Sequence, residues 1–173
     1  MSLPTYDQLM LPLLKLLSEQ QEAIKFGEMA RLLAESSGLS QEELSLRLSS
    51  GTKTVFYDRT GWAKTYLAKA GLINQPKRGF CELSPIGRQL DLVKLTSITN
   101  EFLMQFESFS NYKLGISKEK QQIQQEKNID RTLLKKSDDQ RTPDEIIIET
   151  TELLKESLKS DLLKLVKENN PAF

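Results

Sequence analysis

Eight basic residues lie between positions 47 and 88, and their side chains are well suited to a charged partner. They are Arg47, Lys53, Arg59, Lys64, Lys69, Lys77, Arg78 and Arg88. Only two acids, Asp58 and Glu82, occur in the same stretch, although the whole chain has 24 basic and 24 acidic residues and a formal net charge of zero. Lysine and arginine bind phosphate oxygens, so this local excess of positive charge predicts a nucleic-acid partner.

Side chains that carry out catalysis or bind metals are scarce. The sequence has no histidine and a single cysteine, Cys81. This composition excludes Ser-His and Cys-His nucleophile pairs, zinc fingers and an internal disulfide. We expect Cys81 to be a small buried hydrophobic residue, since a reactive thiol needs a special environment. We expect no cofactor in this chain.

A metal-dependent nuclease site needs an acid and, after a strand, a glutamate or glutamine two residues before a lysine. Asp144 follows Pro143, but this pair is typical of a helix N-terminus, and residues 152–155 behind it have the wrong spacing. Residues 125–127 (Gln-Glu-Lys) have the right spacing but precede the acid and lie in polar sequence. We interpret both as chance matches, so we expect no catalytic residues and predict that this chain is not an enzyme.

Apolar residues at helical spacing predict four helices ahead of a short hairpin. The first begins with a capping box at Thr5, and Pro12 should bend this helix or delay its start. The second spans about 27–37, the third begins with a capping box at Ser40, and the fourth spans about 54–70. Helices in this number and order, followed by a hairpin, are typical of a winged helix-turn-helix.

Two β segments, 72–75 and 80–83, follow the fourth helix. The turn between them, Pro76-Lys77-Arg78-Gly79, places two positive charges at the tip of the predicted wing. Ser84-Pro85 then opens another helix, because proline suits a first helical position.

The residues expected to contact DNA form two groups. Lys64 on the fourth helix, with Lys77 and Arg78 in the wing, should bind phosphates. The start of the fourth helix should face base edges in the major groove, through Lys53, Thr54, Tyr57 and Thr60. Arg59 and Trp62 have the phase of the buried face, so we expect structural roles for both. The alternative is an ordinary solvated basic face on a winged helix that binds proteins.

We predict a mainly α fold, an α+β winged helix-turn-helix with a C-terminal helical extension. The expected units are a DNA-binding domain (1–95), a helix and polar linker (96–141), and an amphipathic helix (142–173) that begins at Thr142. The apolar stripe of that last helix needs a partner. The partner is the same domain, a second copy in a homodimer, or a domain outside this sequence. No apolar run of about 18 residues and no secretory signal is present, so we expect a cytoplasmic protein without a membrane span.

Several short stretches carry a resemblance to a known family. They are Leu3-Pro4-Thr5-Tyr6-Asp7, Ser50-Gly51, Asp58-Arg59-Thr60-Gly61-Trp62-Ala63, Lys69-Ala70-Gly71-Leu72, Arg78-Gly79 and Leu83-Ser84-Pro85-Ile86-Gly87. With them, residues 3–90 resemble the N-terminal domain of Mrr-type restriction endonucleases. The resemblance covers about half of the chain and implies a DNA-recognition module attached to a nuclease domain. That domain would have the restriction-endonuclease-like α/β fold, use a divalent ion, normally magnesium, and act on modified, especially methylated, DNA.

The chain stops at residue 173, close to where the resemblance would place the start of the nuclease domain, so no metal ligand is carried over. We therefore expect the recognition domain of a modification-directed restriction system, which binds double-stranded DNA that carries methyl groups in some cases. Such a chain would be a truncated piece, a split gene product or a stand-alone relative. The alternative function is a stand-alone winged-helix transcriptional regulator that dimerises through its C-terminal helix.

Overall fold

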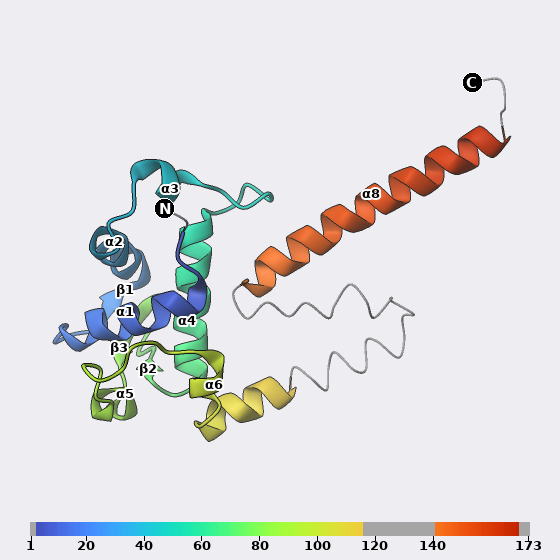
Figure 1. The fold of residues 1–173 in the computed structure, drawn as a ribbon. Coiled ribbons are helices and arrows are strands. Elements are labelled where there is room, and N and C mark those ends of the chain that lie inside the picture. Colours follow the sequence, from blue (N-terminus) through green and yellow to red (C-terminus); the bar gives the residue numbers. More distant parts are fainter. Residues whose placement is uncertain (1–2, 116–140, 170–173) are drawn as a thin grey trace.

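The computed structural model describes residues 3–115 and 141–169 (Figure 1). Its elements are α1 (Tyr6–Ser18), β1 (Ile24–Lys25), α2 (Phe26–Ser36), α3 (Gln41–Ser45), α4 (Val55–Lys69), β2 (Ile73–Asn74), β3 (Phe80–Leu83), α5 (Pro85–Gln89), α6 (Asn100–Leu103), a further helix at 107–115, and α8 (Pro143–Asn169). Helices α1 to α4 precede the β2–β3 hairpin. This mainly helical fold with a small antiparallel sheet confirms the predicted winged-helix fold class.

The helix starts that were predicted from capping residues are confirmed. The backbone N–H of Thr5 donates to Gln8 Oε1 at 3.1 Å, and Ser40 Oγ accepts from the backbone N–H of Glu43 at 3.2 Å. Helix α1 runs through Pro12 without a break, so the alternative of a delayed start is wrong. The apolar face of α1 is fully buried in the core, which offsets the backbone hydrogen bond that proline removes.

The sheet has three strands in the order β1-β3-β2, all antiparallel, and β1 was not predicted. Ile24 lies opposite Cys81, and Lys25 lies opposite Phe80. A strand of two residues has no alternating pattern that sequence could reveal. Its pairing brings the start of α2 beside the wing, where the backbone N–H of Phe26 donates to Gly79 O at 2.8 Å.

The hydrophobic core is built around α1 and α4, which cross at the centre of the molecule (Figure 1). Cys81 belongs to this core with 1% exposure, as predicted. The core also contains Ile98, Leu103 and Phe109, each at most 1% exposed, so the segment after residue 95 packs back on the domain. The predicted boundary at residue 95 stays a prediction, and the residues that follow it share the core of the winged part. The single helix expected there is divided into α6 and 107–115.

Helix α8 begins with the predicted capping box. The backbone N–H of Thr142 donates to Glu145 Oε2 at 2.7 Å, and the backbone N–H of Glu145 donates to Thr142 Oγ1 at 3.2 Å. Beyond its first turns α8 extends away from the body of the molecule (Figure 1). The predicted apolar stripe is exposed, with 53–62% exposure for Ile147, Leu154, Leu158, Leu162 and Leu165.

A cluster of polar residues holds the start of α8 against the start of α4. The hydroxyl of Thr142, which is fully buried, donates to Asp58 Oδ2 at 2.7 Å. The Lys53 amine lies 2.5 Å from Asp58 Oδ1 and 2.6 Å from Asp144 Oδ2. We call Lys53, Asp58, Thr142 and Asp144 the Asp58 cluster.

Arg59 adds a second connection between the same two helices. Its Nε donates to Glu145 Oε1 at 2.9 Å, and its Nη1 donates to the carbonyl oxygens of Leu3 and Pro4 at 3.1 and 3.2 Å. One guanidinium thus joins α4, α8 and the segment before α1. The structural role expected for Arg59 agrees with these contacts, all of which are internal.

Replacing Gly87 with alanine should destabilise the domain. A Cβ atom at Gly87 would lie 2.3 Å from the carbonyl oxygen of Leu72 and 2.9 Å from Leu83 Cδ1, so the backbone or the core must shift. We expect a loss of roughly 1–3 kcal/mol in the free energy of unfolding, measured by urea denaturation. Gly27→Ala is the matched control, because a Cβ there meets nothing within 4 Å and should stabilise α2 slightly. A Gly87→Ala midpoint at or above wild type would contradict this packing.

Replacing Thr142 with alanine should release the start of α8. The change removes an N-cap, worth about 1 kcal/mol, and a bond to a buried carboxylate, worth at least about another 1 kcal/mol. Hydrogen exchange should then accelerate at residues 143–149 while the amides of α1 keep their protection. Thr151→Ala is the control, since Thr151 is exposed and its hydroxyl bonds only within α8. Equal protection of residues 143–149 in both variants would show that the Asp58 cluster does not hold α8.

Candidate nucleic-acid interface

Helix α4, the predicted recognition helix, offers a narrower surface than its sequence pattern indicates. Only Tyr57 and Lys69 are exposed along its length, and its other side chains are buried or half-buried. Phe26 of α2 lies against it on one side, and the start of α8 covers another. The surface of α4 available to a ligand is therefore the strip near Tyr57 and Lys64, together with Lys69 at the end of the helix.

Thr60 does not lie on that strip, and its predicted exposure is wrong. It is 0% exposed, and its hydroxyl donates to the carbonyl oxygen of Phe56 at 2.8 Å. Thr60 follows Phe56 by four residues and precedes Ala63 by three, and both neighbours are buried, so its phase is that of the core face. Thr60 therefore cannot contact base edges.

Thr54 and Lys53 are engaged inside the protein. Thr54 is the N-cap of α4, and its hydroxyl accepts from the backbone N–H of Tyr57 at 3.4 Å. Lys53 is bound by the two carboxylates of the Asp58 cluster. In this arrangement neither side chain is presented to a base edge as expected.

The pKa values of the two carboxyl groups in the Asp58 cluster are shifted in opposite directions. Burial raises the pKa of Asp58, against the opposing effect of Lys53, whereas the hydrogen bond from Lys53 lowers the pKa of Asp144. The stabilisation from Asp144 is therefore present above its ordinary pKa and is lost as the pH falls through the lowered value. The contribution of Asp58 has the opposite sign, because it is lost as the pH rises through the raised value. Both carboxylates raise the pKa of Lys53, and the hydrogen bond to Asp144 has the larger effect. Lys53 therefore keeps its positive charge, but that charge is balanced by the two carboxylates.

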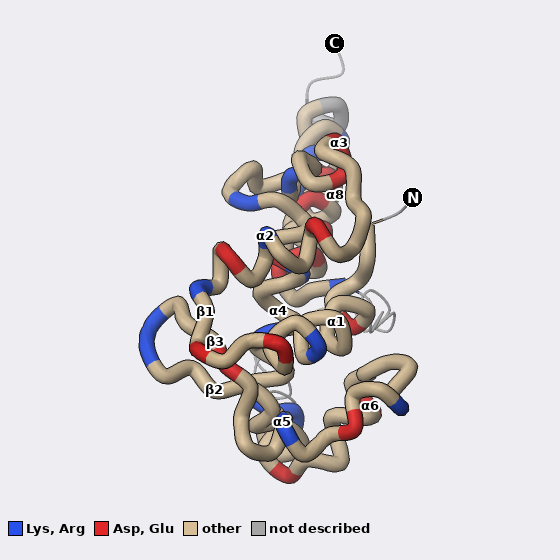
Figure 2. Tube along the Cα trace, turned by 90° about the vertical axis from the view of Figure 1, so that its left-hand side faces the viewer, with Lys and Arg blue, Asp and Glu red and all other residues tan. Residues whose placement is uncertain are grey.

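Four exposed or half-exposed cations surround the wing, and we call them the basic face. They are Lys25, Lys64, Lys77 and Arg78. Figure 2 shows the wing turn between β2 and β3 as a continuous basic stretch, with a further basic position at β1 beside it. Lys77, Arg78 and Lys64 were predicted from sequence. Lys25 was missed, because it lies outside the basic stretch and the pairing of β1 with β3 brings it here.

Aromatic rings support the cations of this face. The Lys77 amine lies 4.0 Å from the ring centre of Phe80, and the Lys25 amine lies 6.0 Å from the same centre. The Lys64 amine lies 5.1 Å from the ring centre of Phe26. Rings hold a cation in place without neutralising it, so these amines remain available to an anionic partner.

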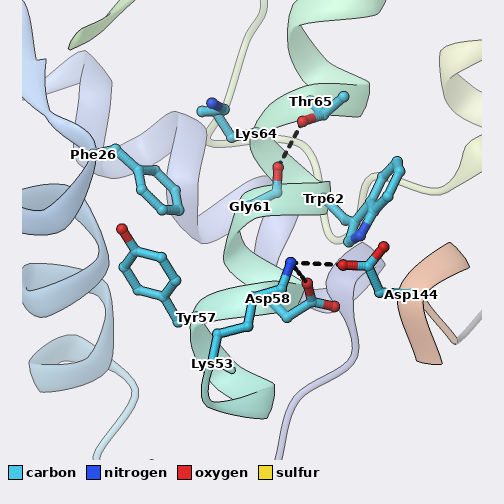
Figure 3. A pocket seen from close by; sticks show the side chains of 9 residues that line it. All are labelled: Phe26, Lys53, Tyr57, Asp58, Gly61, Trp62, Lys64, Thr65 and Asp144. Atoms are coloured by element: carbon cyan, nitrogen blue, oxygen red, sulfur yellow. Dashed lines mark hydrogen bonds and ion pairs between the residues drawn. The ribbon is translucent and has the colours of Figure 1, made fainter. Parts of the chain in front are cut away.

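A hollow of about 260 Å³ lies next to the basic face, above the backbone of Gly61 in α4 (Figure 3). Phe26 and Tyr57 form one wall, with ring centres 4.8 Å apart in an edge-to-face contact, and Trp62 forms the opposite wall. The remaining lining comes from Lys53, Asp58, Lys64, Thr65 and Asp144. We call this the Gly61 hollow. It was not predicted, because the residues that line it come from three separate helices, α2, α4 and α8, and from the segment just before α4.

Trp62 was expected in the core and is half-buried. Its ring packs edge-to-face on Tyr66, with centres 5.9 Å apart, and it lies against the hydrophobic core while it also lines the Gly61 hollow. Tyr57, expected at a base edge, is 42% exposed beside the hollow.

Asp144, a candidate nuclease acid in sequence, is occupied as a partner of Lys53. Within residues 3–115 and 141–169, no three acidic or cysteine side chains lie together in a way that could hold a metal ion. The Gln-Glu-Lys segment at 125–127 lies outside the described residues. No helix in the described part of the chain is long and apolar enough to cross a membrane.

Comparison with known proteins gives a consistent result for the winged part. The sequence model of the Mrr N-terminal domain family matches residues 6–92. The type IV methyl-directed restriction enzyme EcoKMrr of Escherichia coli (strain K12) is 32% identical over 87 residues. This similarity covers 50% of the chain but only 28% of the relative's length. No solved structure matches the chain. The matched residues contain the wing, α4 and the basic face, and through them the chain belongs to the Mrr N-terminal domain family.

Proposed function

We propose that this chain binds double-stranded DNA as the modification-directed recognition domain of an Mrr-like restriction protein. The observation that carries the proposal is the basic face, because it gathers cations from β1, α4 and the wing around the neighbouring rings of Phe26 and Phe80. Phosphate contacts supply most of the affinity of such a domain for DNA. The relative named as a methyl-directed restriction enzyme supports the choice of modified DNA as the partner.

The basic face and the strip on α4 suggest a division of roles. Lys25, Lys77 and Arg78 are placed to bind phosphate oxygens on either side of a groove that receives the wing or α4. Tyr57 is the residue of the predicted base-reading group that remains exposed. Sequence or modification would therefore be read near Tyr57 and the Gly61 hollow, and position along the duplex would be set by the cations.

The family relationship also suggests partners. We propose that the domain works with a nuclease domain that uses magnesium, as the resemblance to Mrr-type enzymes implies. The exposed apolar stripe of α8 offers a surface for that domain or for a second copy of this chain.

The first test is the dependence of DNA affinity on salt. Lys64→Ala and Lys77→Ala should each weaken binding to all sequences about equally and lower the slope of log affinity against log salt by about 1. Fluorescence anisotropy with a labelled random-sequence duplex measures both quantities. Lys94→Ala is the control, because Lys94 pairs with Asp91 at 2.8 Å and is not part of the basic face. An affinity that does not change with salt would overturn the DNA proposal and favour a protein partner.

A second candidate function is a stand-alone transcriptional regulator that dimerises through α8. The exposure of the apolar stripe favours it, since a solvated stripe of this length is typical of a helix that pairs. Such a regulator would have no reason to prefer modified DNA, so methylation separates the two candidates.

The methylation test compares duplex pools of the same sequences with and without methyl groups on cytosine or adenine. A recognition domain that buries one methyl group should bind the modified pool about fourfold more tightly, which corresponds to about 0.8 kcal/mol. Competition between differently labelled pools measures the ratio directly, and Lys77→Ala should keep this ratio while losing affinity for both pools. Equal binding to the two pools would favour the regulator.

A further inference from the structure

We propose that the Gly61 hollow is a receptor for a single unpaired nucleobase that carries an exocyclic amino group, turned out of the duplex bound at the basic face. This inference rests on the proposed binding of DNA and identifies the part of the base that the domain would read. Its evidence is the glycine in the floor of the hollow, the aromatic walls, and the charged groups on the rim (Figure 3).

The floor of the hollow is a glycine that the fold does not require. Gly61 lies in the interior of α4 with ordinary helical backbone angles, where glycine costs about 1 kcal/mol relative to alanine. A Cβ atom there would meet only Phe26 Cζ, at an ordinary contact distance of 3.7 Å. Neither packing nor backbone conformation explains this residue. Its effect is that the backbone of α4 lines the hollow directly at this position.

The walls are aromatic on both sides, which suits a planar ring. Phe26 and Tyr57 come from α2 and α4, and Trp62 lines the other side of the hollow (Figure 3). Proteins that act on or read single bases stack the base against aromatic side chains in this way. A volume of about 260 Å³ is below the range of about 300–1,000 Å³ for drug-sized ligands, so the occupant is small.

The rim has groups for both parts of a nucleotide. Lys64, held by the ring of Phe26, lies on the side of the basic face and is placed to bind the phosphate of the extruded nucleotide. Asp144 lies on the rim and is 35% exposed, and its bond to Lys53 uses one of its two carboxylate oxygens, Oδ2. A carboxylate accepts hydrogen bonds from an exocyclic amino group such as cytosine N4. The start of α8 thus completes the hollow that α2 and α4 begin.

The experiment uses three duplexes that differ at one central position: a paired cytosine, a mismatched cytosine and an abasic site. A receptor for an unpaired base should bind the mismatched duplex roughly tenfold or more tightly than the paired one. The reason is that turning a mismatched cytosine out of the duplex costs less free energy than turning out a paired one. The abasic duplex is equally easy to distort but has no base to capture, so it should not share this gain. Trp62 is the single tryptophan of the chain, and its fluorescence should be quenched most by the mismatched cytosine.

Gly61→Leu fills the hollow, and Lys25, Lys77 and Arg78 of the basic face lie outside its lining. It should bind the mismatched and abasic duplexes within about twofold of each other, with the salt dependence of the wild type. Gly27→Leu is the matched control, because that glycine also lies in a helix and a Cβ there meets nothing within 4 Å. Gly61→Ala, with its ordinary contact to Phe26, keeps the test available if the leucine variant does not fold.

The outcomes separate the two proposals. Salt-dependent binding with no difference between mismatched and abasic duplexes, or a preference that persists in the Gly61 variants, would overturn the nucleobase receptor while DNA binding stands. Failure of the wild type to bind any duplex would overturn DNA binding, and the receptor with it.

Discussion

The carboxylate of Asp58 is almost completely removed from water at the start of the central helix, and an ionised group in that position has to be compensated. Thr142 and Lys53 provide the compensation, and Lys53 in turn recruits Asp144. Residues more than 80 positions apart are joined in this way. The neutralisation of Lys53 and the rim of the Gly61 hollow depend on this one buried charge, and the placement of α8 depends on it together with the Arg59 contacts.

The consequence for the proposed interface is a shift of position. The first turn of a recognition helix usually meets the bases, but here the start of α4 is occupied by the acids of α8. The cations that remain available lie at β1, at the wing and at Lys64. The available surface is therefore centred on the wing and the middle of α4, where the Gly61 hollow also lies.

Much of the fold could be predicted because its signals are local. The capping boxes at Thr5, Ser40 and Thr142 and the turn of the wing are read within a few residues, and all were confirmed. The site was predicted less well because its determinants are distant in sequence. A count of charges treats Lys53 as available. It cannot show that Asp144, 91 positions further along the chain, lies 2.6 Å from the Lys53 amine. The prediction for Thr60 was wrong for a different reason. Its polar side chain indicates exposure, but it lies on the core face of α4.

The length of helix α8 and its attachment to α4 determine how far its free end lies from the rest of the fold. Its 27 residues correspond to about 40 Å at the usual helical rise, which is slightly more than one turn of a DNA duplex. Because its first turn is fixed to α4 by a buried network instead of a flexible joint, the helix acts as a rigid spacer. A molecule that docks on the far end of this spacer would be held about 40 Å from the start of α4, in a direction set by the Asp58 cluster and the Arg59 contacts.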